Sequence, residues 1–251
     1  FFTQTADEKK VGSLEEALSS HQPKQMYEPG EVTAYSNWGA ALAAFIVERV
    51  SKTDYVEYVH KNIFEPLGME HTSIGATYQD HAWVKQQREK LACYDALGEK
   101  LPGNGIYYIF IYPAGSAAGT MHDLLTFAQA ITPNENKSCP LFKNQKTLEQ
   151  LYTATSFYGS SSVPNNYHGF FSSKYGVETL GHSGNTFGCS TMLQFDPDTG
   201  IGMVVMTNQA CETVYNYNMY NLIFGKFSII SSRLDSGRLS FFLGKNLEKI
   251  E

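Results

Sequence analysis

The order of expected elements along the 251 residues predicts an α+β fold with a helical lobe followed by an antiparallel sheet lobe. In the N-terminal part, apolar residues recur at the three-to-four-residue spacing of helices. From about residue 166 onward, short apolar or alternating runs separated by turn residues are typical of strands. We therefore expect one domain over residues 1–227, with the helical lobe at about 24–165 and the sheet lobe at about 166–227, and a tail of unknown role at 228–251.

The first two expected helices begin at polar capping residues. A short helix near Ser13–Ser19 starts at a serine that two glutamates follow closely. A longer helix over residues 38–52 follows Asn37, a residue type that favours the N-cap position. This second helix carries apolar residues or alanines on all of its faces, so we expect it at the centre of the domain.

The next segment combines a helix, an unassigned stretch and a turn. Asp54 is the expected cap of a helix over residues 54–64, which ends near Pro66 and Gly68. Residues 70–90 show no clear period. Residues 91–101 predict a small hairpin around a glycine turn.

Two further helices complete the expected helical lobe. Thr120 and Asp123 form a capping-box pattern, and an apolar stripe extends from there to Ile131, before Pro133. Residues 145–154 predict another helix, and the Ser-, Pro- and Asn-rich segment that follows it predicts a loop.

The sheet lobe consists of four expected strands and a closing helix. The turn Asp196–Gly200 joins the last two strands, which makes that pair an antiparallel hairpin. The closing helix spans residues 214–227. The four expected strands are Tyr167–Phe171, Thr179–His182, Thr191–Phe195 and Ile201–Thr207.

Composition excludes several function classes. The net charge is −6 and the sequence has no long run of Lys or Arg, which argues against a nucleic-acid partner or an anionic membrane surface. No apolar run approaches the roughly 18 residues needed to span a bilayer, so we expect any membrane anchor to lie outside this sequence. The chain starts with Phe1 and shows no signal-peptide pattern, which we interpret as a processed chain or a fragment.

The cysteines and histidines predict no metal site and no cofactor. The sequence contains no Cys-x-x-Cys pair, and its seven histidines show no paired ligand spacing. Four isolated cysteines in a chain of this length do not make a disulfide scaffold. We expect separate thiols at Cys93, Cys139, Cys189 and Cys211.

Two polar clusters are candidates for chemistry. The first is Tyr35-Ser36-Asn37, in which the Tyr and Asn side chains point the same way on an extended stretch. The second is Gly181-His182-Ser183-Gly184-Asn185, at the end of one expected strand and just before the next. Taken alone, Tyr35 is an ordinary packed tyrosine, Asn37 a helix cap, and His182 a strand-end histidine.

These clusters together resemble the serine beta-lactamase and penicillin-binding-protein family, on its class C and esterase-like side. Tyr35-Ser36-Asn37 resembles the family's Tyr-x-Asn motif, and His182-Ser183-Gly184 resembles its Lys-Thr-Gly or His-x-Gly motif. The similarity covers about residues 24–227. Other segments that match in order are Phe64–Ser73, Pro113–Ser116, Asp123-Leu124 and Phe195–Gly200.

One family motif is absent from the chain. No lysine has a serine three positions before it, so the sequence contains no Ser-x-x-Lys, the motif of the nucleophile. The resemblance implies that this motif lies upstream of Tyr35, and we expect the first strands of the sheet and the nucleophile helix to be missing with it. We therefore expect this chain alone to be inactive.

The resemblance implies a hydrolase that acts through an acyl-enzyme on beta-lactams, D-Ala peptides or small esters, with a small molecule or a peptidoglycan-like compound as substrate. It implies catalytic roles for Tyr35, Asn37 and His182, and substrate or oxyanion binding by Ser183, Gly184 and Asn185. It also implies an extracytoplasmic or cell-envelope location. The alternative is a non-catalytic ligand-binding or sensor module that retains the cleft.

Overall fold

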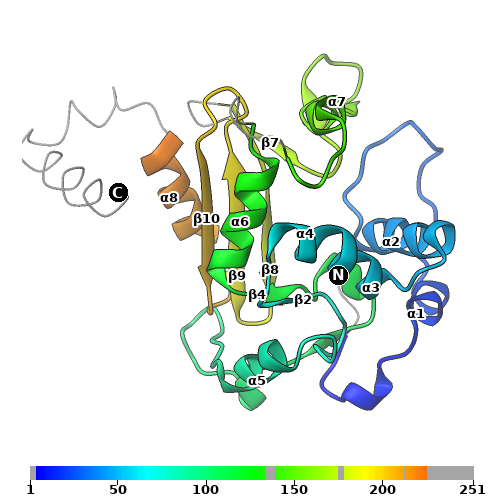
Figure 1. Ribbon diagram of the computed structural model, residues 1–251, viewed down its shortest axis with the longest axis vertical. Coiled ribbons are helices and arrows are strands. Elements are labelled where there is room, and N and C mark those ends of the chain that lie inside the picture. The colour runs from blue at the N-terminus through cyan, green and yellow to red at the C-terminus, as the bar shows by residue number, and fades with distance from the viewer. Residues whose placement is uncertain (1–3, 134–138, 175–177, 212, 225–251) are drawn as a thin grey trace, which may run out of the picture.

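A four-stranded antiparallel sheet forms the centre of the protein. The computed structural model describes residues 4–133, 139–174, 178–211 and 213–224. The sheet has the strand order β10-β9-β8-β7, so each strand lies beside its neighbour in the chain, and helices cover both of its faces (Figure 1). The four strands are β7 (Phe171–Lys174), β8 (Glu178–Thr186), β9 (Cys189–Phe195) and β10 (Gly202–Thr207).

Each face of the sheet packs on one helix because side chains alternate along a strand. One face packs on α6 (Met121–Ile131) through a core of Ala128, Ile131, Leu180, Leu193 and Phe195. The other face packs on α8 (Thr213–Phe224) through Met192, Met203, Tyr220 and Phe224. The sheet is thus the middle layer between two helices.

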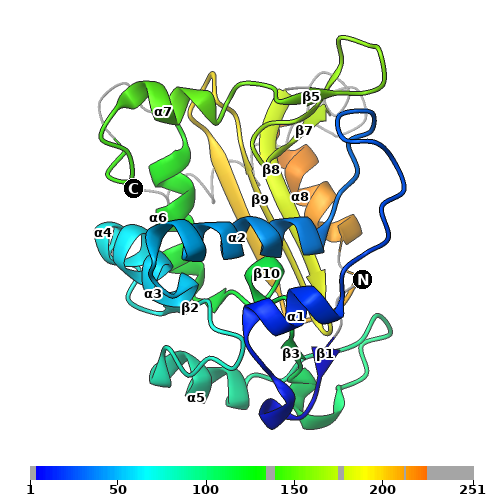
Figure 2. The same ribbon diagram turned by 90° about the vertical axis from the view of Figure 1, so that its right-hand side faces the viewer.

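A further group of helices lies on the α6 side of the sheet, where α2 extends across the strands in the side view (Figure 2). Helices α1 and α2 share a core with the segment around Ile109–Tyr112. The helices of this part are α1 (Leu14–Ser20), α2 (Asn37–Ser51), α3 (Tyr55–Val59), α4 (Glu65–Leu67), α5 (Ala82–Lys90) and α7 (Gln145–Gln150). Single helical turns are η1 (Glu8–Lys10), the π turn η2 (His60–Phe64), η3 (Pro102–Gly105) and η4 (Tyr112–Ala114).

Three small two-stranded ladders connect these parts. They pair distant segments, such as β1 with β3, and so fix loops that have no periodic pattern. The paired strands are β1 (Gln4–Thr5) with β3 (Tyr108–Ile109), β2 (Thr72–Ser73) with β4 (Ala118–Gly119), and β5 (Ser156–Phe157) with β6 (Pro164–Asn166). No helix in the described part of the chain combines the length and apolarity that a bilayer crossing requires.

The local signals for helix starts and for the last hairpin are confirmed. Ser13 and Glu16 form a full capping box at α1, and the Asp54 carboxylate accepts from the backbone N–H groups of Val56 and Glu57 in the first turn of α3. At the far end of the sheet, Gly202 pairs with Phe195 on either side of the predicted turn. These elements follow from residues close together in the sequence.

Two predictions about α2 are wrong. Its N-cap is Ser36, whose Oγ accepts from the Gly39 N–H at 3.0 Å, and Asn37 is the first helical residue. The helix is also not central to the domain, because its fully buried residues are two alanines and Val50 is 79% exposed. An apolar composition therefore did not indicate burial in this helix.

Several boundaries differ from the predictions. The helix expected over residues 54–64 continues through η2 and α4 to Leu67, and Gly68, which was predicted with Pro66 to end it, does so in the left-handed conformation. Helix α5 lies in the stretch that showed no period. At Thr120 only half of the capping box forms, because the Asp123 carboxylate accepts from residues of the 71–72 segment instead.

The remaining differences concern short segments. A single bridge between Tyr94 and Lys100 closes the expected 91–101 hairpin, and the helix expected to reach residue 154 ends at Gln150. Residues 167–170 form a tight turn before β7. Residues 225–227 of the expected closing helix and the tail 228–251 lie outside the described residues.

Candidate active site

The structure places Tyr35 beside His182, although the two residues are far apart in the sequence. Their ring centroids are 5.8 Å apart. Phe171 of β7 completes a cluster of three rings, with centroids 5.9 Å from Tyr35 and 5.5 Å from His182. The two predicted motifs therefore meet at one place, where the chain entering α2 contacts the sheet.

The start of α2 positions the first motif. Ser36 caps the helix with an extended backbone, and the Tyr35 side chain just before it is 62% exposed. Asn37, one residue after the cap, is partly buried, and its Oδ1 is buried with no hydrogen-bond partner among the described residues. Ser36 is occupied by capping, so its hydroxyl has a structural role.

Strand β8 positions the second motif. The ladder between β7 and β8 ends at the pair Phe171–Gly181, while β8 continues to Thr186 along β9. His182 is the first residue of β8 beyond that ladder. From His182 onward, β8 pairs with β9 but no longer with β7, so it is the edge strand of the sheet beside Tyr35.

Strand alternation separates the residues of the second motif. His182 and Gly184 share the face of Leu180, which is the α6 face of the sheet. Ser183 pairs with Met192 of the α8 face, and the Asn185 Oδ1 accepts from the Ser190 Oγ at 2.6 Å. Ser183 and Asn185 can therefore reach a molecule beside Tyr35 only through their backbone groups.

Glycine at position 181 is required by close packing before His182. A Cβ atom there would collide with the backbone oxygen of Leu193 and would lie 2.5 Å from the Gln194 side chain. Only glycine lets β8 and β9 approach as they do. The position of His182 depends on this close approach, because the two residues are adjacent on the same strand.

The electrostatics of Tyr35 favour a protonated phenol. Burial raises the pKa of Tyr35 above its ordinary value near 10. At neutral pH the side chain is therefore a hydrogen-bond donor. A neighbouring cation would be needed to stabilise the phenolate.

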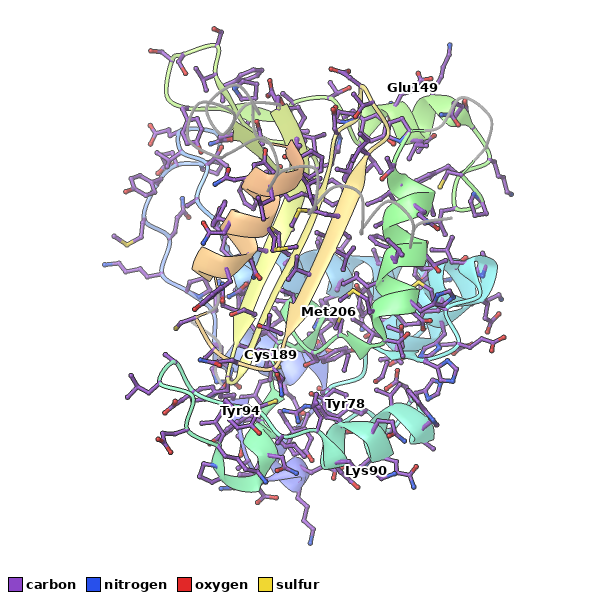
Figure 3. The ribbon with its side chains drawn as sticks, turned by 90° about the vertical axis from the view of Figure 1, so that its left-hand side faces the viewer. Tyr78, Lys90, Tyr94, Glu149, Cys189 and Met206 are labelled. Atoms are coloured by element: carbon purple, nitrogen blue, oxygen red, sulfur yellow. The ribbon has the colours of Figure 1, made fainter. Side chains whose placement is uncertain are left out.

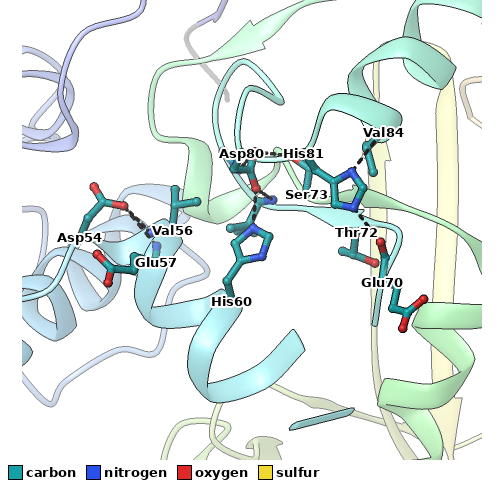
Figure 4. A network of polar contacts seen from close by, with 12 residues as sticks. Asp54, Val56, Glu57, His60, Glu70, Thr72, Ser73, Asp80, His81 and Val84 are labelled. Carbon is teal, nitrogen blue, oxygen red and sulfur yellow. Dashed lines mark hydrogen bonds and ion pairs between the residues drawn. The ribbon is translucent and has the colours of Figure 1, made fainter. Parts of the chain in front are cut away.

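A second polar network, which sequence reasoning missed, surrounds Asp80 (Figure 4). Its carboxylate accepts from His60 Nε2 at 2.8 Å, from Ser73 Oγ at 2.5 Å, and from the backbone N–H groups of Ile74 and Gly75. Serine and histidine both bind the aspartate and not each other, so this is not the order of a catalytic triad. The network ties η2 to the segment after β2, and no local sequence pattern indicates it.

An open cavity of about 320 Å³ lies next to this network, away from Tyr35 and His182. Glu48, Asp54 and Asp80 give it an acidic lining around Tyr112. Burial, with a smaller contribution from these carboxylates, raises the pKa of Tyr112. Among the described residues no group of His, Cys, Asp or Glu has the arrangement of a metal site.

Comparison with known proteins identifies the family. The family model described as Beta-lactamase matches residues 2–222. The chain belongs to the Beta-lactamase family. This membership confirms the resemblance inferred from the ordered motifs.

Curated relatives of the chain include two proteins with partial matches. It is 28% identical over 142 residues to the putative penicillin-binding protein PbpX of Bacillus subtilis. This match covers 54% of the chain and 31% of PbpX. It is 35% identical over 84 residues to the probable hydrolase clz13 of Cochliobolus lunatus, which covers 34% of the chain and 13% of that protein. The chain thus spans less than half the length of these relatives.

Solved structures of the family share the fold. D-amino acid amidase from Ochrobactrum anthropi SV3, complexed with L-phenylalanine amide, superposes with a TM-score of 0.59 at 25% identity, over 80% of the chain and 57% of the amidase. The octameric penicillin-binding protein homologue from Pyrococcus abyssi gives a TM-score of 0.64 at 22% identity, over 86% of the chain and 49% of that protein. The predicted beta-lactamase/DD-peptidase-like fold is therefore confirmed.

Proposed function

We propose that this Beta-lactamase family chain contributes the Tyr-x-Asn and His-x-Gly parts of a serine hydrolase active site. The enzyme would act on beta-lactams, D-Ala peptides or small esters through an acyl-enzyme. The observation that supports this proposal is the contact between Tyr35 and His182, whose rings are 5.8 Å apart. The family uses the two motifs together, and here they are neighbours because the chain entering α2 contacts the sheet.

The nucleophile would come from a Ser-x-x-Lys element that these 251 residues do not contain. A serine hydroxyl is a weak nucleophile and needs a group that accepts its proton. Tyr35 would relay that proton, and the ammonium group of the motif's lysine would lower the raised pKa of Tyr35. Tyr35 would therefore be the base, and the lysine ammonium group would stabilise its phenolate.

Asn37 would receive a donor in the complete site. An unpaired buried acceptor costs about 1–3 kcal/mol, and the Asn37 Oδ1 has no partner among the described residues. A lysine ammonium group or a substrate amide N–H placed there would remove this cost. Asn37 would then orient either the lysine or the substrate.

The edge of β8 would bind the acyl group. The backbone N–H of Asn185 would be one oxyanion donor, with the second donor on the nucleophile's own backbone. Ser183 and Gly184 would line the substrate along the strand. Because the D-amino acid amidase is among the similar structures, a D-amino acid amide or D-Ala peptide is the first substrate to test.

Covalent labelling by a fluorescent penicillin tests the proposal. We expect no label on the 251-residue chain alone, and stoichiometric label on a longer protein that includes an upstream Ser-x-x-Lys. In that longer protein Tyr35→Phe should slow labelling by about 10²-fold or more, the range of a general base. Tyr27→Phe is the matched control, because Tyr27 is also exposed and lies outside the motif.

Two results would contradict the proposal. Stoichiometric label on the chain alone would show that a serine within these residues is the nucleophile. Equal labelling of the Tyr35→Phe and Tyr27→Phe variants would remove Tyr35 from the catalytic machinery. An extracytoplasmic location remains part of the proposal, and a reporter fusion of the full gene product tests it.

The alternative function is a non-catalytic module that binds a ligand in the same cleft. The absence of Ser-x-x-Lys from the sequence favours it. The encoding gene distinguishes the two functions, because a Ser-x-x-Lys upstream of Phe1 supports the enzyme. Without one, calorimetric binding of a D-amino acid amide that His182→Ala abolishes and that leads to no turnover would support the module.

A further inference from the structure

Two of the four cysteines lie in contact at the end of the sheet. The Sγ atoms of Cys93 and Cys189 are 3.7 Å apart and join positions 96 residues apart in the chain. Cys93 is 0% exposed, and Cys189 is partly buried at the first position of β9. Figure 3 shows Cys189 at this end of the strand, close to Tyr94, the neighbour of Cys93.

Backbone hydrogen bonds hold the Cys93 segment in place. The Tyr94 N–H donates to the Asn208 carbonyl at 2.9 Å, and the Ala210 N–H donates to the Tyr94 carbonyl at 3.0 Å. The Asn208 side chain donates to the Ala92 carbonyl at 2.9 Å. Three bonds therefore fix the residues around Cys93 against the end of β10, without any contribution from the thiols.

The tip of the β8–β9 hairpin is shaped to receive this segment. Gly188 has a φ of 70°, and a Cβ atom there would collide with the Cβ of Cys93 and lie 2.8 Å from the Leu101 side chain. The Phe187 ring packs on Tyr107 at a centroid distance of 4.8 Å. The backbone of the Cys93 segment and that of the β8–β9 hairpin tip therefore both hold the two sulfurs close together.

We propose that Cys93 and Cys189 are an oxidisable pair that closes into a disulfide and joins the 91–101 turn to the β8–β9 hairpin. A disulfide bond of about 2.05 Å requires the sulfurs to approach by about 1.7 Å, a shift that side-chain rotation can provide. The oxidant is a low-molecular-weight disulfide such as oxidised glutathione. The two thiols lose two electrons and two protons, and the oxidant is reduced to two thiols.

The surroundings predict slow closure at neutral pH. Burial and the neighbouring Cys93 raise the pKa of Cys189 to about 11, while Arg88 opposes the shift. Tyr78 also interacts with Cys189, and burial raises the pKa of Tyr78 as well. A protonated thiol is a poor nucleophile, so the pair should resist brief exposure to an oxidant and close over hours.

Thiol mapping of the full 251-residue chain tests the proposal. The reduced protein is incubated with excess oxidised glutathione at about pH 8.5, near the pKa of an ordinary thiol. It is then alkylated in denaturant and analysed by mass spectrometry. We expect two protected cysteines, one cross-linked peptide pair containing Cys93 and Cys189, and a Tm about 5–10 °C above that of the reduced protein.

Matched variants complete the test. Cys139→Ala, which removes a buried thiol elsewhere, should retain both the cross-link and the Tm shift. Cys189→Ser should lose both, and if that variant does not fold, the wild-type peptide map alone decides. Four alkylated cysteines, glutathione adducts at Cys93 or Cys189, or a cross-link to Cys139 or Cys211 would overturn the proposal.

Discussion

Asp80 should be a major determinant of stability. Replacing it with alanine removes the acceptor for four hydrogen bonds, two from side chains and two from backbone N–H groups. One of the donors, Ser73, is 0% exposed, so its hydroxyl would lose its partner inside the protein. The change therefore leaves buried donors without a partner.

The expected loss follows from these donors. A hydrogen bond to a charged group contributes about 1.5–3 kcal/mol, and the contributions within one network are not additive. Removing one partner of a buried ionic network costs about 3–5 kcal/mol in total. We therefore expect Asp80→Ala to lower the free energy of unfolding by about 3–5 kcal/mol and the Tm by about 10 °C.

The pH dependence provides an independent check. Burial alone would raise the pKa of Asp80, but the hydrogen bonds from His60, Ser73 and the backbone outweigh it and hold the pKa below its ordinary value. The folded-state pKa is thus lower than the unfolded value of about 3.9. The stabilisation by the carboxylate is complete above about pH 5 and is lost as the pH falls through the folded-state pKa.

Urea denaturation monitored by tryptophan fluorescence measures both effects. The difference in the free energy of unfolding between wild type and Asp80→Asn should be constant above about pH 5 and should become smaller below about pH 4. Asp198→Ala is the matched control, because Asp198 is exposed, and its cost should stay within about 0.5 kcal/mol. If Asp80→Ala costs no more than Asp198→Ala, the network does not stabilise the fold.

Three further changes test the packing and the site. Gly181→Ala should prevent correct pairing of β8 with β9, because the added Cβ meets the Leu193 backbone oxygen. Amide hydrogen exchange along β8 should then be at least 10-fold faster in the variant, which corresponds to about 1.4 kcal/mol. Unchanged exchange would show that the strands can separate without cost. Ser36→Ala should lower the free energy of unfolding by about 1 kcal/mol through loss of the α2 cap, and Ser36→Thr should restore most of it in thermal denaturation. Phe195→Ala should cost about 3–5 kcal/mol in urea denaturation, because the ring is fully buried between β9 and α6, and a cost under about 1 kcal/mol would refute that packing.

Elements specified by neighbouring residues could be predicted from the sequence. The caps Ser13 and Asp54 and the turn before Gly202 each act within a few residues, and the structure confirms them. The family motifs also predicted that Tyr35 and His182 belong to one site, and the structure places them in contact. Their functional roles stay predictions.

Features that depend on distant partners could not be predicted in the same way. Asp80 binds His60 and Ser73 across segments that show no common period, and Asp123 turns away from its helix to bind Thr72. The burial of α2 was overestimated for the same reason. Its sequence reports the apolarity of its residues, and only the tertiary structure decides which of them are covered.

Tyr35 and Asn37 lie on either side of Ser36, the residue that caps α2, and both would interact with the same incoming group. The Asn37 Oδ1 offers an acceptor that is unpaired among the described residues, and Tyr35 stays protonated at neutral pH unless a cation stabilises its phenolate. One lysine ammonium group would satisfy both requirements, because the two residues are adjacent to the same helix cap. With that cation in place, the Tyr35 phenolate could accept the proton of a serine nucleophile. The enzyme therefore depends on this cation, whereas a module that binds a neutral ligand at Asn37 would function with Tyr35 protonated.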